Sequence, residues 1–199
     1  MEKICCIFAA GEYSSLPDLP KNRFIIAADG GEEALLKMNI TPDISLGDFD
    51  SITFSPRGKE KISFSSRKDD TDTQLAIKEG LKRGFKTFYI YGALGGRLDH
   101  AIANLQSLGF IAEKGGRGFI LDGNRKITAI KDSFKIEKGT PFSLFALSGE
   151  VEGLTISGAE YEGEDITLSP LSSLGVSNKA INETVVSLKK GVLHIFLGE

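Results

Sequence analysis

The stretch FIIAADGG at residues 24–31 decides the predicted fold class. Its first part, Phe24–Ala28, is continuously apolar, as expected of a strand that is buried on both faces of a sheet. The Asp-Gly-Gly turn ends the strand, and apolar residues then recur at helical spacing at Ala34, Leu35 and Met38. An earlier run, Ile4–Ala9, is also continuously apolar. Together these segments predict the first strands and the first helix of an α/β sheet.

This alternation of strand and helix continues to about residue 120. Further short strands are predicted at Ile44–Leu46, Ile62–Phe64 and Phe88–Tyr91. Thr71 can cap a helix that carries the apolar residues Leu75, Ala76, Ile77 and Leu81. A later helix has an apolar side made of Leu98, Ala101, Ile102, Leu105 and Leu108. The rhythm predicts an α/β N-terminal domain with a mainly parallel, Rossmann-like sheet.

After Gly123 the pattern changes to short alternating segments that are separated by turn residues. Strands are predicted at Lys126–Lys131, Phe142–Ala146, Gly153–Ser157, Ile166–Leu168, Thr184–Leu188 and Val192–Leu197. No helix of normal length is visible there, which predicts an antiparallel β-sandwich or barrel. We therefore place a domain boundary near Gly123-Asn124, with an α/β domain over residues 1–123 and an all-β domain over residues 124–199.

The composition excludes several functional classes. With 41% hydrophobic residues the 199-residue chain can bury a core, and its net charge of -3 gives no reason to expect binding to nucleic acid or an anionic membrane. No apolar run approaches the ~20 residues that cross a bilayer. Residues 1–3 do not resemble the start of a signal peptide. The two cysteines, Cys5 and Cys6, are adjacent in an apolar run, which predicts buried thiols and a reducing, cytoplasmic location.

Aspartate is concentrated at apparent strand ends: eight of the twelve aspartates lie between Asp29 and Asp99. Asp48 and Asp50 are two residues apart, so on an extended strand end they would point the same way and could bind one cation. An Asx turn would also explain the pair. Asp69 and Asp72 flank a predicted helix start, where a carboxylate can instead cap backbone N–H groups. Short carboxylates suit Mg²⁺, which usually completes its shell with substrate phosphates, so the pattern favours phosphoryl transfer.

A glycine-rich connection, Gly92–Arg97, joins a predicted strand to a helix. Its backbone N–H groups and the helix N-terminus could bind an anion, and Arg97 could contact phosphate, although a tight structural turn explains the glycines as well. His100 follows this loop and could contact a ligand, whereas His194 lies in a terminal strand and is expected to be structural. The P-loop, dinucleotide and protein-kinase signatures are missing from the sequence.

Read in order, these motifs resemble those of the thiamin pyrophosphokinase family. The matching stretches are ADGG at 28–31, Pro42-Asp43 followed by GDFDS at 47–51, KDDTD at 68–72, GGRLDH at 95–100 and Ser177-Asn178. The resemblance spans most of the chain. It implies a catalytic α/β domain that binds the nucleotide and pyrophosphate, followed by a β-sandwich domain for thiamin binding and dimerisation. It also implies a homodimer in which the two chains share each active site.

The implied reaction is Mg²⁺-dependent transfer of the β,γ-pyrophosphoryl group of ATP to the hydroxyl of thiamin, which gives thiamin diphosphate and AMP. The implied metal ligands are Asp48, Asp50 and Asp72, with Asp69 next. Catalysis is assigned to Asp48, Asp50, Asp72, Asp99 and Arg97, with either Asp99 or Asp72 as the general base. ATP and its pyrophosphate are assigned to Asp29, Gly30, Gly31, Lys68, Asp69, Thr71, Gly95, Gly96, Arg97 and His100. Thiamin is assigned to Tyr161, Ser177 and Asn178. Animal members of the family place a tryptophan on the sandwich domain; this chain has no tryptophan, and Tyr161 occupies the matching stretch as the expected aromatic platform.

Other functions stay open at this point. A pyrophosphokinase for another heterocyclic alcohol, such as a hydroxymethylpterin, would keep the acidic motifs and change only the acceptor pocket. A thiamin-binding or sensing protein without catalysis predicts eroded acidic motifs, whereas all of them are intact here. A purely structural scaffold would leave like charges clustered without a counter-ion, which is costly where they are partly buried.

Overall fold

The computed structural model describes residues 3–13, 15–49, 54–65 and 69–198. Over these residues the fold is mostly sheet, with thirteen strands and three α-helices. The chain divides into two compact units: Met1–Ser107 with Ile120–Gly123, and Leu108–Phe119 with Asn124–Glu199. Within the described ranges, no helix is both long and apolar enough to span a membrane.

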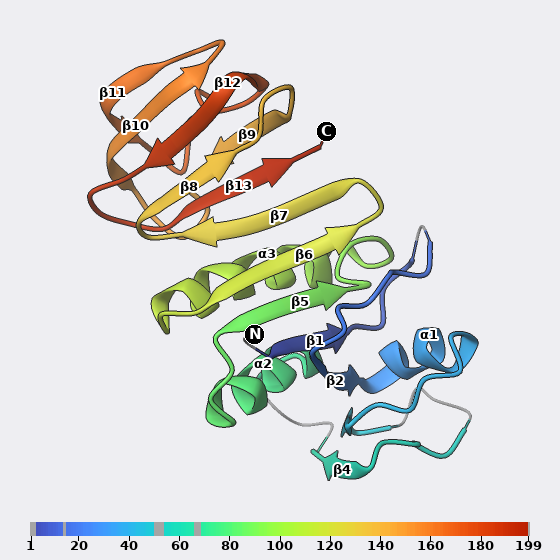
Figure 1. The fold of residues 1–199 in the computed structure, drawn as a ribbon. Helices are drawn as coiled ribbons and strands as arrows, with labels where there is room; N and C mark the ends of the chain where they lie inside the picture. Colours follow the sequence, from blue (N-terminus) through green and yellow to red (C-terminus); the bar gives the residue numbers. More distant parts are fainter. Residues whose placement is uncertain (1–2, 14, 50–53, 66–68, 199) are drawn as a thin grey trace. The chain divides into compact units, whose positions relative to one another are not determined.

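The first unit contains a parallel sheet with the strand order β5-β1-β2-β3-β4 (Figure 1). Its strands are β1 (Ile4–Phe8), β2 (Arg23–Ala28), β3 (Ile44–Gly47), β4 (Glu60–Ser63) and β5 (Thr87–Tyr91). The five predicted strands of this region are therefore confirmed. The chain adds β2, β3 and β4 on one side of β1 and then returns to place β5 on the other side. The strand order thus reverses between β1 and β5.

Both faces of this sheet are covered, which explains the continuous apolar runs. Cys6 belongs to a buried cluster with Leu35 of α1 (Glu32–Lys37). Its neighbour Cys5 points to the opposite face, as alternate strand residues do, and lies against Gly80 of α2 (Asp72–Lys82). A Cβ atom at Gly80 would come within 3.0 Å of Cys5 Sγ and 2.6 Å of the Phe88 ring. Glycine therefore allows α2 to pack directly on the sheet.

The prediction that the two cysteines are buried is confirmed. Cys5 and Cys6 have no solvent exposure, and both thiols are free. Burial raises the pKa of Cys5, and it raises the pKa of Cys6 to about 12. Both side chains are therefore neutral thiols at physiological pH, and they act as small apolar groups.

The helix α3 (Leu98–Glu113) is present, but the prediction of its apolar side was wrong at its start. Leu98 and Ile102 are 75% and 50% exposed. The buried side of this part of the helix carries Asn104 and Ser107 instead. Asn104 Nδ2 donates to the carbonyl of Ala93 (2.9 Å), and Ser107 Oγ donates to Gln74 Oε1 (2.6 Å). Hydrogen-bond requirements, rather than hydrophobicity, select the inward face here.

A buried carboxylate holds the segment that leads into β4. Glu32 is 1% exposed, and its two oxygens accept hydrogen bonds from Ser45 Oγ (2.6 Å) and the backbone N–H of Arg57 (2.6 Å). The N–H of Gly58 donates in turn to Ser45 Oγ (2.8 Å). A Cβ atom at Gly58 would collide with the backbone of Ser45, so the two segments can approach this closely only with glycine there.

The second unit is antiparallel, with the strand order β11-β10-β12-β9-β13-β7 and with β8 paired to β12. The strands are β7 (Arg125–Ile130), β8 (Ser133–Ile136), β9 (Pro141–Phe145), β10 (Val151–Ala159), β11 (Gly163–Leu168), β12 (Asn178–Ser187) and β13 (Leu193–Leu197). Apolar residues from all seven strands form one buried cluster. The six predicted segments are confirmed, but β8 and the preceding β6 (Arg117–Asp122) were not predicted.

The Glu32 network leads to a stability prediction. Glu32→Ala should lower the free energy of unfolding by about 1–3 kcal/mol, because the buried hydroxyl of Ser45 and the N–H of Arg57 lose their acceptor. Denaturant unfolding measures the change. Glu33→Ala, at the exposed next position of α1, is the matched control and should change stability little. Equal losses for the two variants would contradict this account of the network.

A second prediction concerns the inward face of α3. Asn104→Ala should cost about 1–2 kcal/mol of unfolding free energy, because the Ala93 carbonyl loses its buried donor. Gln106→Ala, an exposed amide on the same helix, serves as the control. Thermal and denaturant unfolding of the two variants would show the difference. If Asn104→Ala were as stable as the control, the Asn104 bond would not determine which face of α3 is buried.

Candidate functional site

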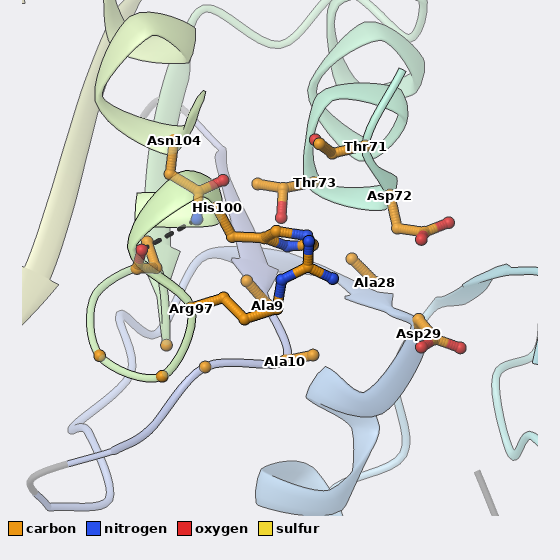
Figure 2. A pocket seen from close by; sticks show the side chains of 15 residues that line it. Ala9, Ala10, Ala28, Asp29, Thr71, Asp72, Thr73, Arg97, His100 and Asn104 are labelled. Carbon is orange, nitrogen blue, oxygen red and sulfur yellow. Dashed lines mark hydrogen bonds between the residues drawn. The ribbon is translucent and has the colours of Figure 1, made fainter. Parts of the chain in front are cut away.

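A pocket of about 300 Å³ lies where the strand order reverses, beyond the carboxyl ends of β1, β2 and β5 (Figure 2). Open α/β sheets bind ligands at this place, because loops from neighbouring strands diverge there. We call it the switch-point pocket. Its lining consists of Ala9, Ala10, Gly11, Ala28, Asp29, Thr71, Asp72, Thr73, Gly92, Ala93, Gly95, Gly96, Arg97, His100 and Asn104.

Backbone contacts bring the ends of β1 and β5 together below this pocket. The N–H of Ala9 donates to the carbonyl of Tyr91 (2.9 Å), and the N–H of Gly11 donates to the carbonyl of Gly92 (2.9 Å). A Cβ atom at Gly92 would collide with the ring of Tyr13, and Gly92 has a φ of +62°. Glycine at this position therefore leaves room for the Tyr13 ring and permits the positive φ.

The loop after β5 continues through Gly95 and Gly96, whose φ angles are +83° and +67°. These angles lie in the left-handed region that favours glycine. A Cβ atom at Gly96 would meet nothing within 4 Å, so conformation rather than space accounts for that glycine. The turn leads directly into α3, and the loop and the beginning of this helix form one side of the pocket (Figure 2).

Thr71 and Asp72 stand at the start of α2, on another side of the pocket. Thr71 is the N-cap, and its Oγ1 accepts a hydrogen bond from the N–H of Gln74 (3.2 Å), as predicted. Asp72 is the first helical residue and lines the pocket. Because Thr71 provides the cap, capping does not account for the carboxylate at position 72. The positive end of the helix dipole favours a negative charge at this position.

Asp29 brings a second carboxylate to the pocket from the end of β2. Its φ of +46° is unusual for a residue other than glycine. A Cβ atom built on Gly47, at the end of β3, would lie 3.3 Å from Asp29 Oδ1. The Asp29 carboxylate therefore lies against the end of β3, immediately before Asp48 in the sequence. This geometry places two of the predicted acidic motifs next to each other.

Arg97 lines the pocket and forms an ion pair with Asp99. Arg97 Nη2 lies 2.6 Å from Asp99 Oδ2, and Arg97 Nε lies 3.1 Å from Asp99 Oδ1. This hydrogen bonding lowers the pKa of Asp99 and raises the pKa of Arg97. Asp99 thus stays ionised at neutral pH. Both side chains are largely exposed, so the pair is accessible to solvent and contributes little to stability.

The pocket brings together seven of the residues predicted to bind ATP or to act in catalysis, and leaves five outside its lining. Those in the lining are Asp29, Thr71, Asp72, Gly95, Gly96, Arg97 and His100. Those outside it are Gly30, Gly31, Asp48, Asp69 and Asp99. At Gly31 a Cβ atom would collide with the carbonyl of Phe8, so this glycine has a packing role. Asp50 and Lys68 lie outside the described residues.

Sequence reasoning missed several lining residues. Ala9–Gly11 follows the first predicted strand, so the rule that ligands bind at strand ends could have identified it. Thr73 and Asn104 are polar residues inside predicted helices, and both are buried. Their only sequence signal was a polar residue next to apolar helix positions, which is too common to identify a site.

Among the described residues, no three His, Cys, Asp or Glu side chains gather closely enough to hold a metal ion without other ligands. Magnesium sites at phosphates need only one or two carboxylates, since the substrate and water complete the shell. Asp29 and Asp72 both line the pocket, and glycine-loop backbone and Arg97 lie in the same lining. This donor set fits a metal–phosphate group.

A smaller pocket of about 100 Å³ lies in the second unit; we call it the turn pocket. It is lined by Leu154, Ile156, Tyr161, Glu162, Ile166, Leu168, Leu174, Gly175, Val176 and Asn178. Tyr161 is 65% exposed, and Asn178 is 8% exposed at the first position of β12. Two of the three predicted thiamin residues therefore line one pocket, whereas Ser177 is not part of its lining.

Comparison with known proteins matches both parts of the chain. Residues 18–116 match the family model "Thiamin pyrophosphokinase, catalytic domain", and residues 128–193 match "Thiamin pyrophosphokinase, vitamin B1 binding domain". The chain is 30% identical to the thiamine pyrophosphokinase of Bacillus subtilis (strain 168), over 94% of each chain. It is 26% identical to thiamin pyrophosphokinase 1 of Caenorhabditis elegans, over 96% of this chain and 87% of that one.

A solved structure agrees with these matches. The crystal structure of thiamine pyrophosphokinase from Bacillus subtilis superposes with a TM-score of 0.88 at 27% identity, and the match covers 98% of this chain and 99% of that one. The sequence matches and the structural match thus extend over both units. The chain belongs to the thiamin pyrophosphokinase family.

Proposed function

We propose that the chain transfers the β,γ-pyrophosphoryl group of ATP to the hydroxyl of thiamin, with Mg²⁺ at the phosphates, and releases AMP. As a member of its family, the chain is a thiamin diphosphokinase, an enzyme that forms thiamin diphosphate. The main support for pyrophosphoryl transfer from ATP is the switch-point pocket. It combines two carboxylates, an arginine and a glycine-rich loop at the strand ends where α/β sheets bind ligands.

The proposed phosphate contacts come from the glycine-rich loop and the start of α3, on one side of this pocket. Arg97 and the backbone of Gly95 and Gly96 would bind phosphate oxygens, and His100, on the next turn, would contact the nucleotide. Arg97 is exposed and is paired with a carboxylate that is also exposed, so it can exchange Asp99 for a phosphate. Asp29, Gly30, Gly31, Lys68, Asp69 and Thr71 complete the proposed ATP-binding set.

Asp48, Asp50 and Asp72, with Asp69 next, remain the proposed metal ligands, and the position of Asp29 beside the end of β3 supports adding it to them. Bound Mg²⁺ would neutralise charge that grows on the phosphate oxygens in the transition state. The protein groups would position the two substrates, and positioning provides much of the acceleration in phosphoryl transfer.

Of the two candidates for the general base, the structure supports Asp72 over Asp99. Asp72 lines the pocket, whereas Asp99 does not. Hydrogen bonding to Arg97 also lowers the pKa of Asp99, and a more acidic carboxyl group is a weaker base. Asp99 then serves mainly to hold Arg97 in place before the substrate binds.

The thiamin end is assigned to Tyr161, Ser177 and Asn178, with the exposed ring of Tyr161 as the platform for the cationic heterocycle. The turn pocket has about 100 Å³, whereas ligand pockets usually span roughly 300–1,000 Å³. A second surface would therefore have to complete the thiamin site. This supports the proposal of a homodimer with shared active sites.

We also propose that the two parts of the chain have different roles. Residues 1–123 would form a Rossmann-like catalytic domain and residues 124–199 a β-sandwich that binds thiamin and forms the dimer. The parallel sheet of the first unit and the single apolar cluster of the second support this division. The two free, buried cysteines support a reducing, cytoplasmic location.

A product assay tests the function directly. Purified protein with ATP and thiamin should form AMP and thiamin diphosphate in equal amounts, and only when Mg²⁺ is present. Chromatography of both products gives the measurement, and hydroxymethylpterin replaces thiamin as the control acceptor. Formation of AMP with the pterin but not with thiamin would instead favour the pyrophosphokinase for another alcohol.

Asp72 and its neighbour Asp70 provide a matched pair of variants. Asp72→Asn should lower kcat about a hundredfold or more, because it removes a carboxylate from the pocket, while the thermal midpoint changes little. Asp70 forms an ion pair with Lys78 (2.7 Å) and is not part of the lining, so Asp70→Asn should retain near-normal kcat. Wild-type turnover of Asp72→Asn would exclude Asp72 from metal binding and from proton transfer.

A further inference from the structure

We propose that Asn178 is a positioning residue for Tyr161: its side-chain amide fixes the backbone of Tyr161 and thereby sets the place of the ring, instead of contacting the substrate. The inference rests on the proposed function for one point only, the role of Tyr161 as the thiamin platform. It refines the thiamin assignment by separating the residue that would touch the heterocycle from the one that holds it.

The amide of Asn178 is bonded to both backbone groups of Tyr161. The N–H of Tyr161 donates to Asn178 Oδ1 (3.1 Å), and Asn178 Nδ2 donates to the carbonyl of Tyr161 (2.8 Å). The N–H of Lys179 donates to the same Oδ1 (2.8 Å). A carboxamide oxygen accepts two hydrogen bonds and its nitrogen donates two. The acceptor capacity of Asn178 is therefore fully used within the chain.

The position of Asn178 in the fold matches this role. It opens β12 and is 8% exposed, while Tyr161 lies in the short connection between β10 and β11. The preceding residue, Ser177, has a φ of +61°, an unusual conformation outside glycine. A packed strand thus presents the amide of Asn178 to the β10–β11 connection. The positive φ of Ser177, which is rare in residues other than glycine, directs the chain into β12.

Other contacts hold the base of this connection but do not bond to Tyr161. Thr184 Oγ1 donates to the carbonyl of Gly158 (2.7 Å), and the N–H of Glu160 donates to the carbonyl of Lys179 (2.8 Å). Among the hydrogen bonds of the described residues, those of Asn178 are the ones that reach Tyr161 itself. Tyr161 is 65% exposed, so packing alone fixes its side chain weakly. A preorganised platform binds better because less motion is lost on binding.

The absence of tryptophan from the chain permits a specific test. Tyr161→Trp introduces a single indole fluorophore at the platform in the full-length protein. In this background Asn178→Ala should lower the fluorescence anisotropy of the introduced indole and increase its quenching by acrylamide. The KM for thiamin should rise about five- to tenfold, as expected for lost hydrogen bonds, while kcat and the KM for ATP stay unchanged. Asn182→Ala, an exposed asparagine on the same strand, is the control and should alter none of these.

Two results would overturn the proposal. A higher KM for thiamin with unchanged anisotropy would mean that Asn178 contacts the substrate directly. Unchanged anisotropy and unchanged KM would mean that its bonds do not position Tyr161. Asn178→Asp decides the matter if Asn178→Ala does not fold. It keeps the acceptor for two N–H groups but replaces the donor to the Tyr161 carbonyl by a carboxylate oxygen that repels it, so changes in the same direction are expected.

The fluorescence arm needs no substrate, so it separates this inference from the proposed function. If Asn178→Ala mobilises the introduced indole but Tyr161→Ala leaves the KM for thiamin unchanged, the positioning role stands and the platform role of Tyr161 fails. If Tyr161→Ala raises that KM while Asn178→Ala leaves the indole immobile, the platform role stands and the positioning role fails.

Discussion

The pairing of β1 with β5 is the constraint on which the rest of the first unit depends. Because the strand order reverses there, the loops after these strands turn apart and leave a pocket above them. Hydrogen bonds from Ala9 and Gly11 tie the two strand ends together, and glycine at Gly92 leaves room for the ring of Tyr13. The pocket is therefore a consequence of chain topology, and the side chains that line it determine its chemistry.

Local charge, not the net charge of -3, suits this pocket to a phosphate ligand. Asp29 and Asp72 bring negative charge that a metal ion would bridge to phosphate, whereas Arg97 brings positive charge on a solvent-exposed side chain. The turn pocket in the second unit has a different character, because aliphatic side chains and one exposed aromatic ring dominate its lining. Such a division suits the two proposed substrates of opposite charge, ATP and a cationic heterocycle.

Much of this arrangement follows from local sequence patterns. Continuous apolar runs predicted the parallel strands because both faces of that sheet are covered by helices. Thr71 predicted the start of α2 because the hydrogen bond of an N-cap side chain stays within the first turn of the helix. The early part of α3 could not be predicted in the same way. Its inward face depends on partners for Asn104 and Ser107 that are distant in sequence, and the apolar Leu98 and Ile102 remain exposed. Asn178 and Tyr161 are also far apart in the sequence, so no local pattern indicated a partner for Asn178.

The close packing of Gly80 on Cys5 and Phe88 has a dynamic consequence for the switch-point pocket. A helix in direct contact with a sheet cannot slide or tilt without opening a void, so the start of α2 forms a fixed wall. On the opposite wall, two glycines with positive φ precede Arg97, and nothing crowds Gly96. Adjustment to a phosphate chain would then occur by backbone rotation in that turn, on the nanosecond-to-microsecond timescale of loop motion. Binding would recruit the arginine toward the stationary carboxylate of Asp72, and not the reverse.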